Sequence, residues 1–155
     1  MHEKKQTVIL YHGGCPDGFG GAFSAWKKFG DTVEYIPVKH GRSAPEGLED
    51  RDLIFIDFSY PQAIMDAYVQ SARSLTVLDH HLGAKSVVES MPAHVFDETH
   101  SGAVLAWKYF HPEEEVPLLL SYVEDGDLYV FTLPDSRAVL AYVYAQRFTF
   151  EEWDM

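Results

Sequence analysis

The sequence has a single cysteine, Cys15, so no disulfide can form within the chain. Disulfide-stabilised scaffolds are typical of secreted domains, and their exclusion favours a reducing compartment. The longest apolar runs are far shorter than the about 20 residues that a membrane-spanning helix needs. The start of the chain, MHEKKQTVILYHGG, lacks the apolar core and the small-residue cleavage site of a signal peptide. These absences predict a cytoplasmic protein with no membrane partner.

Positive charge is also scarce. Lysines and arginines number 12 against 24 aspartates and glutamates, which gives a formal net charge of −12. Proteins that bind duplex DNA regardless of its sequence do so through basic surfaces that release counterions, so the charge argues against this class. An acidic protein can still bind phosphate where bound divalent cations reverse the local charge. Part of the excess of carboxylates is therefore expected to form a metal site.

The sequence does contain enough apolar material for one packed interior. Of its 155 residues, 46% are hydrophobic and 14% are aromatic. This length suits a single domain, and no low-complexity tract or internal repeat divides it. We therefore expect residues 1–155 to form one domain.

Apolar, β-branched runs alternate with segments of helical periodicity along the first 110 residues. The predicted strands are residues 7–12, 32–38, 52–58, 74–81 and 93–98. The predicted helices are residues 17–30, 61–72 and 99–110, the last capped by Thr99 or Ser101. This alternation predicts an α/β fold with a Rossmann-like, mainly parallel five-stranded sheet flanked by helices. Two or three further helices are expected after residue 113, interrupted by the acidic sequence EDGDL at 124–128.

Acidic and imidazole side chains follow three of the predicted strands. His12 ends the first, Asp57 follows the third, and Asp79, His80 and His81 follow the fourth. Ligands of parallel sheets bind at the carboxyl ends of the strands, so these groups are expected to meet at one edge. Carboxylates and imidazoles bind ions such as Mn²⁺ and Zn²⁺, and a pair of ions needs a bridging carboxylate.

Each of these residues also has an ordinary structural explanation. Asp57 is compatible with a loop cap, and backbone groups can satisfy a histidine such as His80 or His81. The sequence CPDG around Asp17 is typical of a turn. Their predicted convergence at one edge favours a functional site over three separate structural roles.

Four motifs occur in order along the chain: YHGGCPDGFGGA, DLIFIDF, VLDHH and THSGA. In this order the motifs resemble the DHH phosphoesterase superfamily, which includes oligoribonucleases, cyclic dinucleotide phosphodiesterases, single-strand exonucleases, exopolyphosphatases and family II inorganic pyrophosphatases. The tripeptide DHH is a weak signal by itself, whereas four ordered motifs are specific. The resemblance covers roughly residues 7–127.

The resemblance implies a pair of divalent cations, normally Mn²⁺, with Mg²⁺ or another divalent ion as the alternative. The implied ligands are His12, Asp17, Asp57, Asp79, His80 and Asp125. Asp57 would bridge the two ions, and Asp127 is left open as an alternative to Asp125. Asp79 would be a ligand or would orient an imidazole. His81, the other implied catalytic residue besides Asp79, would face the substrate phosphate.

The chain departs from the family pattern in two places. The first motif of the family usually carries a histidine and then two aspartates two residues apart. In this chain Asp17 is the one aspartate of the motif, and Cys15 and Phe19 occupy the positions two residues before and after it. His12 is also one residue further from Asp17 than in the common family spacing. Cys15 is left open between a soft metal ligand and a small buried hydrophobe. The usual second domain, with its glycine-rich basic motif, is also expected to be absent. Substrate would then be held by a minimal surface, or by a lid from a partner protein or a second copy of the chain.

The expected activity is hydrolysis of a phosphoester or phosphoanhydride in a short oligonucleotide or nucleotide-like substrate, by a water that two metal ions activate. Substrate contacts are expected from His81 and from the loop residues Lys39, His40 and Arg42. Ser101 and Gly102 would add backbone N–H groups at a helix start. Two alternatives remain open: a nucleotide-binding or phosphate-binding module that has lost turnover, and a structural α/β domain whose acids serve only as caps.

Overall fold

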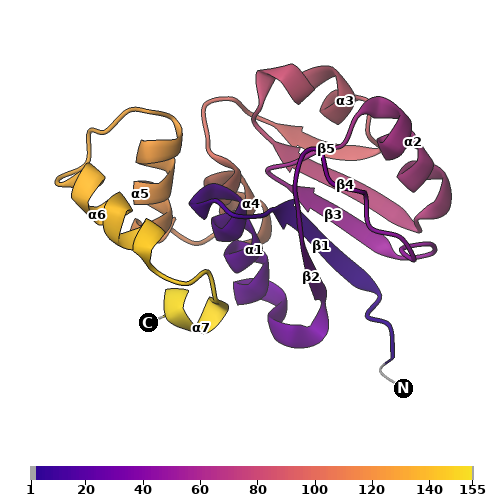
Figure 1. Cartoon of the computed structure of the whole chain (residues 1–155), viewed down its shortest axis with the longest axis horizontal. Coiled ribbons are helices and arrows are strands. Elements are labelled where there is room, and N and C mark those ends of the chain that lie inside the picture. The colour runs from indigo at the N-terminus through magenta and orange to yellow at the C-terminus, as the bar shows by residue number, and fades with distance from the viewer. Residues whose placement is uncertain (1–2, 155) are drawn as a thin grey trace.

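A computed structural model describes residues 3–154 of the chain. Its centre is a five-stranded sheet with the strand order β2-β1-β3-β4-β5, and every neighbouring pair is parallel (Figure 1). The strands are β1 (Thr7–His12), β2 (Glu34–Val38), β3 (Asp52–Ile56), β4 (Ser74–Asp79) and β5 (Ala93–Phe96). The strand β1 is in register with both neighbours, since Leu10 pairs with Ile36 on one side and Phe55 on the other. The predicted α/β fold is confirmed.

Helices cover both faces of the sheet, which explains why its inner strands are almost wholly apolar. One face carries α1 (Pro16–Phe29) and α4 (Gly102–Phe110), and the other carries α2 (Gln62–Ser71) and α3 (Lys85–Glu89) (Figure 1). Successive residues of β1 point to opposite faces. Val8 and Leu10 pack in the core that includes Met65 of α2, whereas Ile9 packs in the core that includes Ala106 of α4.

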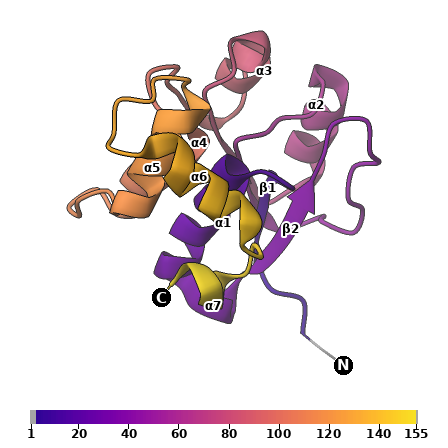
Figure 2. The same cartoon turned by 60° about the vertical axis from the view of Figure 1, so that its left-hand side comes forward.

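Three C-terminal helices extend the layer of α1 and α4 away from the sheet. They are α5 (Leu118–Asp127), α6 (Ser136–Ala145) and α7 (Phe150–Trp153) (Figure 2). Phe19 of α1, Trp107 of α4, Leu120 of α5 and Trp153 of α7 share one apolar cluster. This cluster holds the C-terminal helices against α1 and α4. Within residues 3–154, no helix is both long and apolar enough to cross a membrane.

The acidic sequence EDGDL does not interrupt the C-terminal helices as expected. Residues 124–127 form the last turn of α5, which ends at Asp127 with Leu128 as its C-cap. Aspartate and glycine are poor helix formers, but tertiary packing overrides this preference. A Cβ atom at Gly126 would lie 2.3 Å from Leu140 Cδ1 of α6, so α6 can pack this closely only where the side chain is absent. The short helix α3 was not predicted.

The strand order creates a crevice at the carboxyl edge of the sheet. The chain leaves β1 toward β2 on one side and later returns to β3 on the other side of β1. The loops after β1 and β3 therefore diverge, and ligands of doubly wound sheets bind where this happens. His12 ends β1 and Asp57 directly follows β3, so both lie at this switch point.

Candidate metal centre

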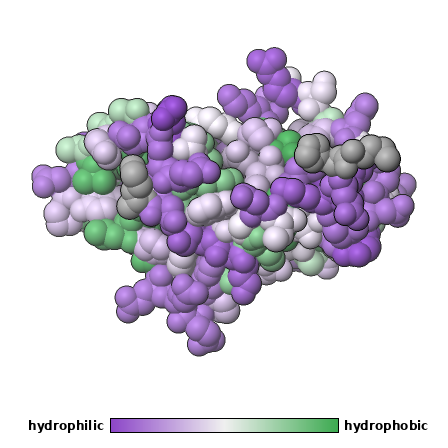
Figure 3. All heavy atoms as spheres, turned by 90° about the horizontal axis from the view of Figure 1, so that it is seen from below, coloured by the Kyte–Doolittle hydropathy of each residue, from purple (hydrophilic) through white to green (hydrophobic). Residues whose placement is uncertain are grey.

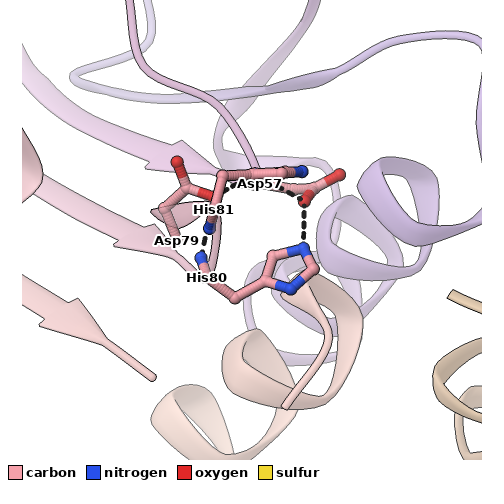
Figure 4. A group of neighbouring side chains, drawn as sticks. All are labelled: Asp57, Asp79, His80 and His81. Carbon is pink, nitrogen blue, oxygen red and sulfur yellow. Dashed lines mark hydrogen bonds and ion pairs between the residues drawn. The ribbon is translucent and has the colours of Figure 1, made fainter. Parts of the chain in front are cut away.

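Acidic and imidazole side chains from four parts of the chain meet at the carboxyl edge of the sheet. The imidazole of His80, just after β4, points at the carboxylate of Asp57 (Figure 4). Its Nε2 atom lies 3.0 Å from Asp57 Oδ1, 3.3 Å from Asp17 Oδ2 and 3.5 Å from Asp127 Oδ2. One imidazole is thus surrounded by three carboxylates, an arrangement that suits a shared cation.

Asp57 is the centre of this cluster. Its carboxylate is 2% exposed, and its two oxygens face different partners. Oδ1 faces His80, whereas Oδ2 lies 3.5 Å from Nδ1 of His12 and 3.9 Å from Sγ of Cys15. No lysine or arginine within residues 3–154 forms an ion pair with Asp57. Burial, and then repulsion from Asp17, raise the pKa of Asp57, so a buried anion here needs a cation.

The backbone of Asp57 is strained. Its φ angle is +59°, a left-handed conformation that few residues other than glycine adopt. Its N–H donates to the carbonyl of Leu78, at 2.9 Å, which ties the loop after β3 to the end of β4. Such conformations persist where the surrounding structure enforces them, and they cluster at functional sites.

Asp17 is held by the N-terminus of α4. Its oxygens accept hydrogen bonds from the N–H groups of Gly102, at 2.9 Å, and Ala103, at 2.8 Å. Burial opposes ionisation of Asp17, but the contact with His80 and these two N–H groups outweigh it and lower its pKa. A helix N-terminus stabilises negative charge, so Asp17 is an anionic group fixed in place.

This contact corrects the expected role of Ser101 and Gly102 in binding substrate. The N–H groups at the start of α4 already bind the Asp17 carboxylate. Ser101 is fully buried, and its Oγ accepts from Val104 N–H as the helix cap. Gly102 is needed for another close approach, because a Cβ atom there would lie 2.6 Å from Cβ of Asp57. The THSGA motif therefore supports two acids of the cluster, and the N–H of Gly102 is already engaged by one of them.

Asp79 orients the loop that carries the two histidines (Figure 4). Its Oδ1 accepts from the backbone N–H of His80, at 2.8 Å, and lies 2.6 Å from Nδ1 of His81. Its Oδ2 is buried and has no hydrogen-bond partner within residues 3–154, a costly state that a cation would relieve. The contact with Asp79 raises the pKa of His81, whose side chain is 52% exposed. His81 thus lies at the mouth of the site with its Nδ1 held by Asp79.

Of the two late aspartates, Asp127 and not Asp125 faces the cluster. The carboxylate of Asp127 points at His80, whereas that of Asp125 points away into the loop between α5 and α6. Asp125 accepts from Thr132 N–H at 2.9 Å, from Thr132 Oγ1 at 3.2 Å and from Leu133 N–H at 3.2 Å. The two acids lie two residues apart near the end of α5, so they point in different directions, and sequence spacing alone left both open.

Asparagine substitutions separate these two roles. Asp127→Asn is expected to lower divalent-cation affinity about tenfold or more with little change in the thermal stability of the metal-free protein. Asp125→Asn should instead lower the free energy of unfolding by about 1 kcal/mol, because the amide keeps one acceptor oxygen and the N–H of Thr132 or Leu133 loses its partner. Calorimetric titration with Mn²⁺ and thermal melts measure the two effects. The reverse pattern would restore Asp125 as the ligand.

Of the loop residues expected to bind substrate, His40 lies closest to the cluster. Its ring centroid is 4.4 Å from that of Phe58, and it lines a cavity of about 340 Å³ together with Asp79 and His81. Lys39 packs over the backbone of Gly14. Arg42 is exposed, and its side chain makes no hydrogen bond or ion pair with any described residue of the cluster. His40 therefore lies beside the cluster, whereas Arg42 lies on the surface, and their predicted contacts with substrate stay predictions.

A second cavity, of about 450 Å³, opens on the other side of the cluster. Asp17 and Asp127 line it together with aromatic residues of the C-terminal helices, and Arg137 is the one lysine or arginine among its described lining residues. The guanidinium of Arg137 lies 3.9 Å from the ring centroid of Phe131. Sequence patterns did not predict this wall, because only tertiary packing brings α6 beside α1. The available signal was the group of tyrosines and phenylalanines at 129–144, of which Tyr129, Tyr142 and Tyr144 are exposed.

The surface around the C-terminal helices differs from the rest of the chain. Figure 3 shows one face on which hydrophilic groups predominate and several apolar groups lie toward the left end, where these helices are. Five of the nine exposed large hydrophobic side chains of the described residues fall within residues 118–144: Leu118, Tyr129, Val130, Tyr142 and Tyr144. Apolar material is thus concentrated on the part of the chain that forms the larger cavity wall.

The donor atoms at the edge fit a pair of divalent cations. Three groups of described residues bring their ligand atoms within 4.8 Å of one another: Asp57, Asp79, His80 and His81; His12, Cys15 and Asp57; and Asp17, His80 and Asp127. Asp57 belongs to two of these groups, and its two oxygens face different ones. Carboxylate and imidazole ligands suit Mn²⁺, Zn²⁺ and similar ions, and a carboxylate that offers one oxygen to each side suits a bridge.

Cation binding is expected to release protons. The contacts with Asp57 and then Cys15 raise the pKa of His12 to about 10. Burial opposes protonation of His80, but the contacts with Asp17 and Asp57 outweigh it and raise its pKa to about 11. Both imidazoles are therefore protonated in the metal-free protein near neutral pH, whereas a metal ligand must be neutral. Titration with Mn²⁺ in two buffers of different ionisation enthalpy should show the release, and affinity should rise with pH.

The same shifts set the sign of the stability change in metal-free protein. Both folded-state pKa values lie above the unfolded value of 6.5, so protonation stabilises the fold fully below that pH. This stabilisation is lost as the pH rises through about 10 to 11. Metal-free protein is thus expected to lose more stability toward alkaline pH than metal-loaded protein. Binding without proton release would contradict the assignment of both imidazoles as ligands.

No protein-family model matches the chain. Its sequence is 30% identical, over an alignment of 171 residues, to Uncharacterized protein R106 of Acanthamoeba polyphaga mimivirus. The alignment covers 99% of this chain and 41% of that relative. A crystal structure of an uncharacterized protein from Helicobacter pylori G27 is similar in fold, with a TM-score of 0.61 and 16% sequence identity. That match covers 82% of this chain and 45% of the other, so the chain spans less than half the length of both proteins.

Proposed function

We propose that the protein is a metal-dependent phosphohydrolase of the DHH type, which cleaves a phosphoester or phosphoanhydride bond with a water activated by two divalent cations. The observation that carries the proposal is Asp57, a buried carboxylate that directs one oxygen to His80 and the other to His12. Among the described side chains its partners are imidazoles and a thiol, which become metal ligands when cations displace their protons. Mn²⁺ is the proposed ion, with Mg²⁺ as the alternative.

The chain's residues divide the work around the reacting phosphate. A bound cation pair would lower the pKa of a water from about 15.7 toward about 7 and would neutralise phosphoryl oxygens. His12 and His80 would each hold one cation, and Asp57 would contribute an oxygen to both. Asp79 fixes Nδ1 of His81, so the exposed Nε2 is free to donate to a phosphoryl oxygen.

The larger cavity supports a substrate with an organic group next to the phosphate. Its volume of about 450 Å³ lies in the range of small-molecule sites. Arg137 supplies positive charge in a chain of net charge −12, and the aromatic walls suit a planar ring such as a nucleobase. A short oligonucleotide or nucleotide-like phosphoester is the substrate class that this combination favours. The cavity also indicates how the chain can hold substrate without a second domain.

A metal-dependent hydrolysis screen tests the proposal. Purified protein with Mn²⁺ is offered dinucleotides, cyclic dinucleotides, nucleotides, pyrophosphate and tripolyphosphate. We expect product from at least one phosphate compound, loss of product with a chelator, and a preference for nucleotide-like compounds over pyrophosphate. Metal-loaded protein that hydrolyses none of them would contradict the proposal. Tight nucleotide binding without turnover would favour the alternative of a binding module.

A further inference from the structure

Cys15 lies among polar donors at the switch point of the sheet. Its Sγ is 3.4 Å from Nδ1 of His12 and 3.9 Å from Oδ2 of Asp57. His12 and Asp57 are themselves 3.5 Å apart through the same two atoms. Cys15 is only partly buried and belongs to none of the apolar clusters of the described residues, so its surroundings do not match those of a small buried hydrophobe.

The three separations match the edges of a tetrahedral site. Zn²⁺ binds sulfur at about 2.3 Å and nitrogen or oxygen at about 2.0–2.2 Å, so tetrahedral ligand atoms lie about 3.3–3.6 Å apart. The observed distances of 3.4, 3.5 and 3.9 Å are close to this range. An octahedral Mg²⁺ at about 2.0–2.1 Å would need neighbouring ligands only about 2.9 Å apart. The separations among His12, Cys15 and Asp57 are therefore closer to a tetrahedral site, and the thiol of Cys15 distinguishes this side of Asp57 from the other.

The helix that follows Cys15 suits an anionic sulfur. Cys15 is the N-cap of α1, and the N–H of Gly18 donates to Sγ at 3.3 Å. Metals bind the thiolate and not the thiol, and the N-terminus of a helix stabilises negative charge. A thiolate is a soft ligand that favours Zn²⁺, whereas Mg²⁺ and Mn²⁺ favour oxygen.

The opposite side of Asp57 offers different donors. Oδ1 of Asp57 faces Nε2 of His80, which also lies 3.3 Å from Asp17 and 3.5 Å from Asp127. These donors are oxygens and one nitrogen. Asp79 belongs to the same group of possible ligands as Asp57 and His80 and adds a further carboxylate to it.

We infer that the two cation positions are chemically different: His12, Cys15 and Asp57 form a thiolate-containing position selective for Zn²⁺, and Asp17, Asp57, His80 and Asp127 form an oxygen-rich position for Mn²⁺ or Mg²⁺. The inference rests on the proposed function for the presence of two cations. It replaces a uniform Mn²⁺ pair with a mixed one, in which Asp57 would contribute one oxygen to each ion.

Cobalt substitution tests the thiolate position by a signal that does not depend on activity. Full-length protein loaded with Co²⁺ should show an ultraviolet sulfur-to-cobalt charge-transfer band together with visible bands of tetrahedral intensity. Cys15→Asp should lose the charge-transfer band and more than about a hundredfold in Zn²⁺ affinity, beyond the 10–100-fold typical of supporting residues. The matched control, His80→Asn, alters the other position and should keep the band.

Metal content gives the stoichiometry. With one equivalent of Zn²⁺ per chain and an excess of Mn²⁺, the wild-type protein should retain its zinc through dialysis, whereas Cys15→Asp should lose most of it. If Cys15→Asp does not fold, alkylation of wild-type Cys15 by iodoacetamide replaces it, and Zn²⁺ should slow that reaction at least about tenfold whereas Mg²⁺ should not. Cobalt-loaded wild-type protein without a charge-transfer band, or alkylation unaffected by Zn²⁺, would overturn the inference.

The phosphohydrolase activity and the mixed cation pair can be contradicted independently of each other. A charge-transfer band without hydrolysis of any phosphate compound would keep the mixed site and reject the phosphohydrolase. Manganese-dependent hydrolysis without that band would do the opposite.

Discussion

Asp57→Asn is expected to abolish manganese-dependent hydrolysis, with a loss of about a thousandfold or more. The substitution keeps the size of the side chain but removes the charge and leaves only one oxygen. Wild-type Asp57 directs Oδ2 toward His12 and Oδ1 toward His80, so an amide cannot serve both sides. Both cation positions are therefore weakened by this one change.

Thermal melts provide a measurement independent of turnover. At a Mn²⁺ concentration about 100 times its dissociation constant, the wild-type protein should gain about 2.7 kcal/mol, or roughly 5–10 °C in melting temperature. Asp57→Asn should lose this gain and keep a cooperative transition without metal. The matched control is Asp66→Asn on the exposed face of α2, which should retain both the shift and the activity. A manganese-dependent shift that survives Asp57→Asn would remove the bridging role.

Gly102→Ala is expected to damage the fold and the site together. An added Cβ would lie 2.6 Å from Cβ and 2.9 Å from Cγ of Asp57. Neither partner can move freely, because Gly102 begins α4 and Asp57 has a strained backbone held to Leu78. Overpacking of this kind costs about 1–3 kcal/mol, which corresponds to roughly 5–10 °C in melting temperature at the upper end.

The loss should extend to metal binding. Moving α4 displaces the N–H groups that hold Asp17, and moving Asp57 disturbs the bridge. The matched control is Gly83→Ala in the loop after His81, where an added Cβ would meet no described atom within 4 Å. That control should change stability by no more than about 0.5 kcal/mol and leave metal affinity unchanged. Equal behaviour of the two variants would show that the contact between Gly102 and Asp57 is unimportant.

Local sequence patterns predicted most of the sheet and much of the cluster. Apolar runs such as TVILYH and DLIFI have few structural alternatives once helical segments separate them. The strand β1 covers the predicted residues 7–12, and β4 ends at Asp79 where the polar triplet begins. Parallel strands bring their carboxyl ends to one edge, so the alternation of strands and helices was enough to predict that His12, Asp57 and His80 lie close together.

Other features depended on the directions in which side chains point, and the spacing of residues in the sequence does not determine these directions. Asp125 and Asp127 differ by two residues on one helix, and only the position of α5 decides which carboxylate reaches His80. The sequence at the start of α4 is typical of an anion-binding site. The anion that it binds in the structure is the carboxylate of Asp17, which lies 85 positions before Gly102 in the chain. Arg137 comes beside the cluster only because α6 packs near α1.

The order of the strands and helices, and the chemical kinds of donor at the strand ends, followed from the sequence because periodicity and residue type are local properties. Which donor atoms meet depended on the three-dimensional packing. This includes the division of Asp57 between two sets of partners, the choice of Asp127, the use of the α4 N-terminus for Asp17, and the contact of Cys15 with His12. Contacts between residues far apart in the chain depend on how helices pack on the sheet. That packing depends on the whole apolar core, so no single sequence motif determines it.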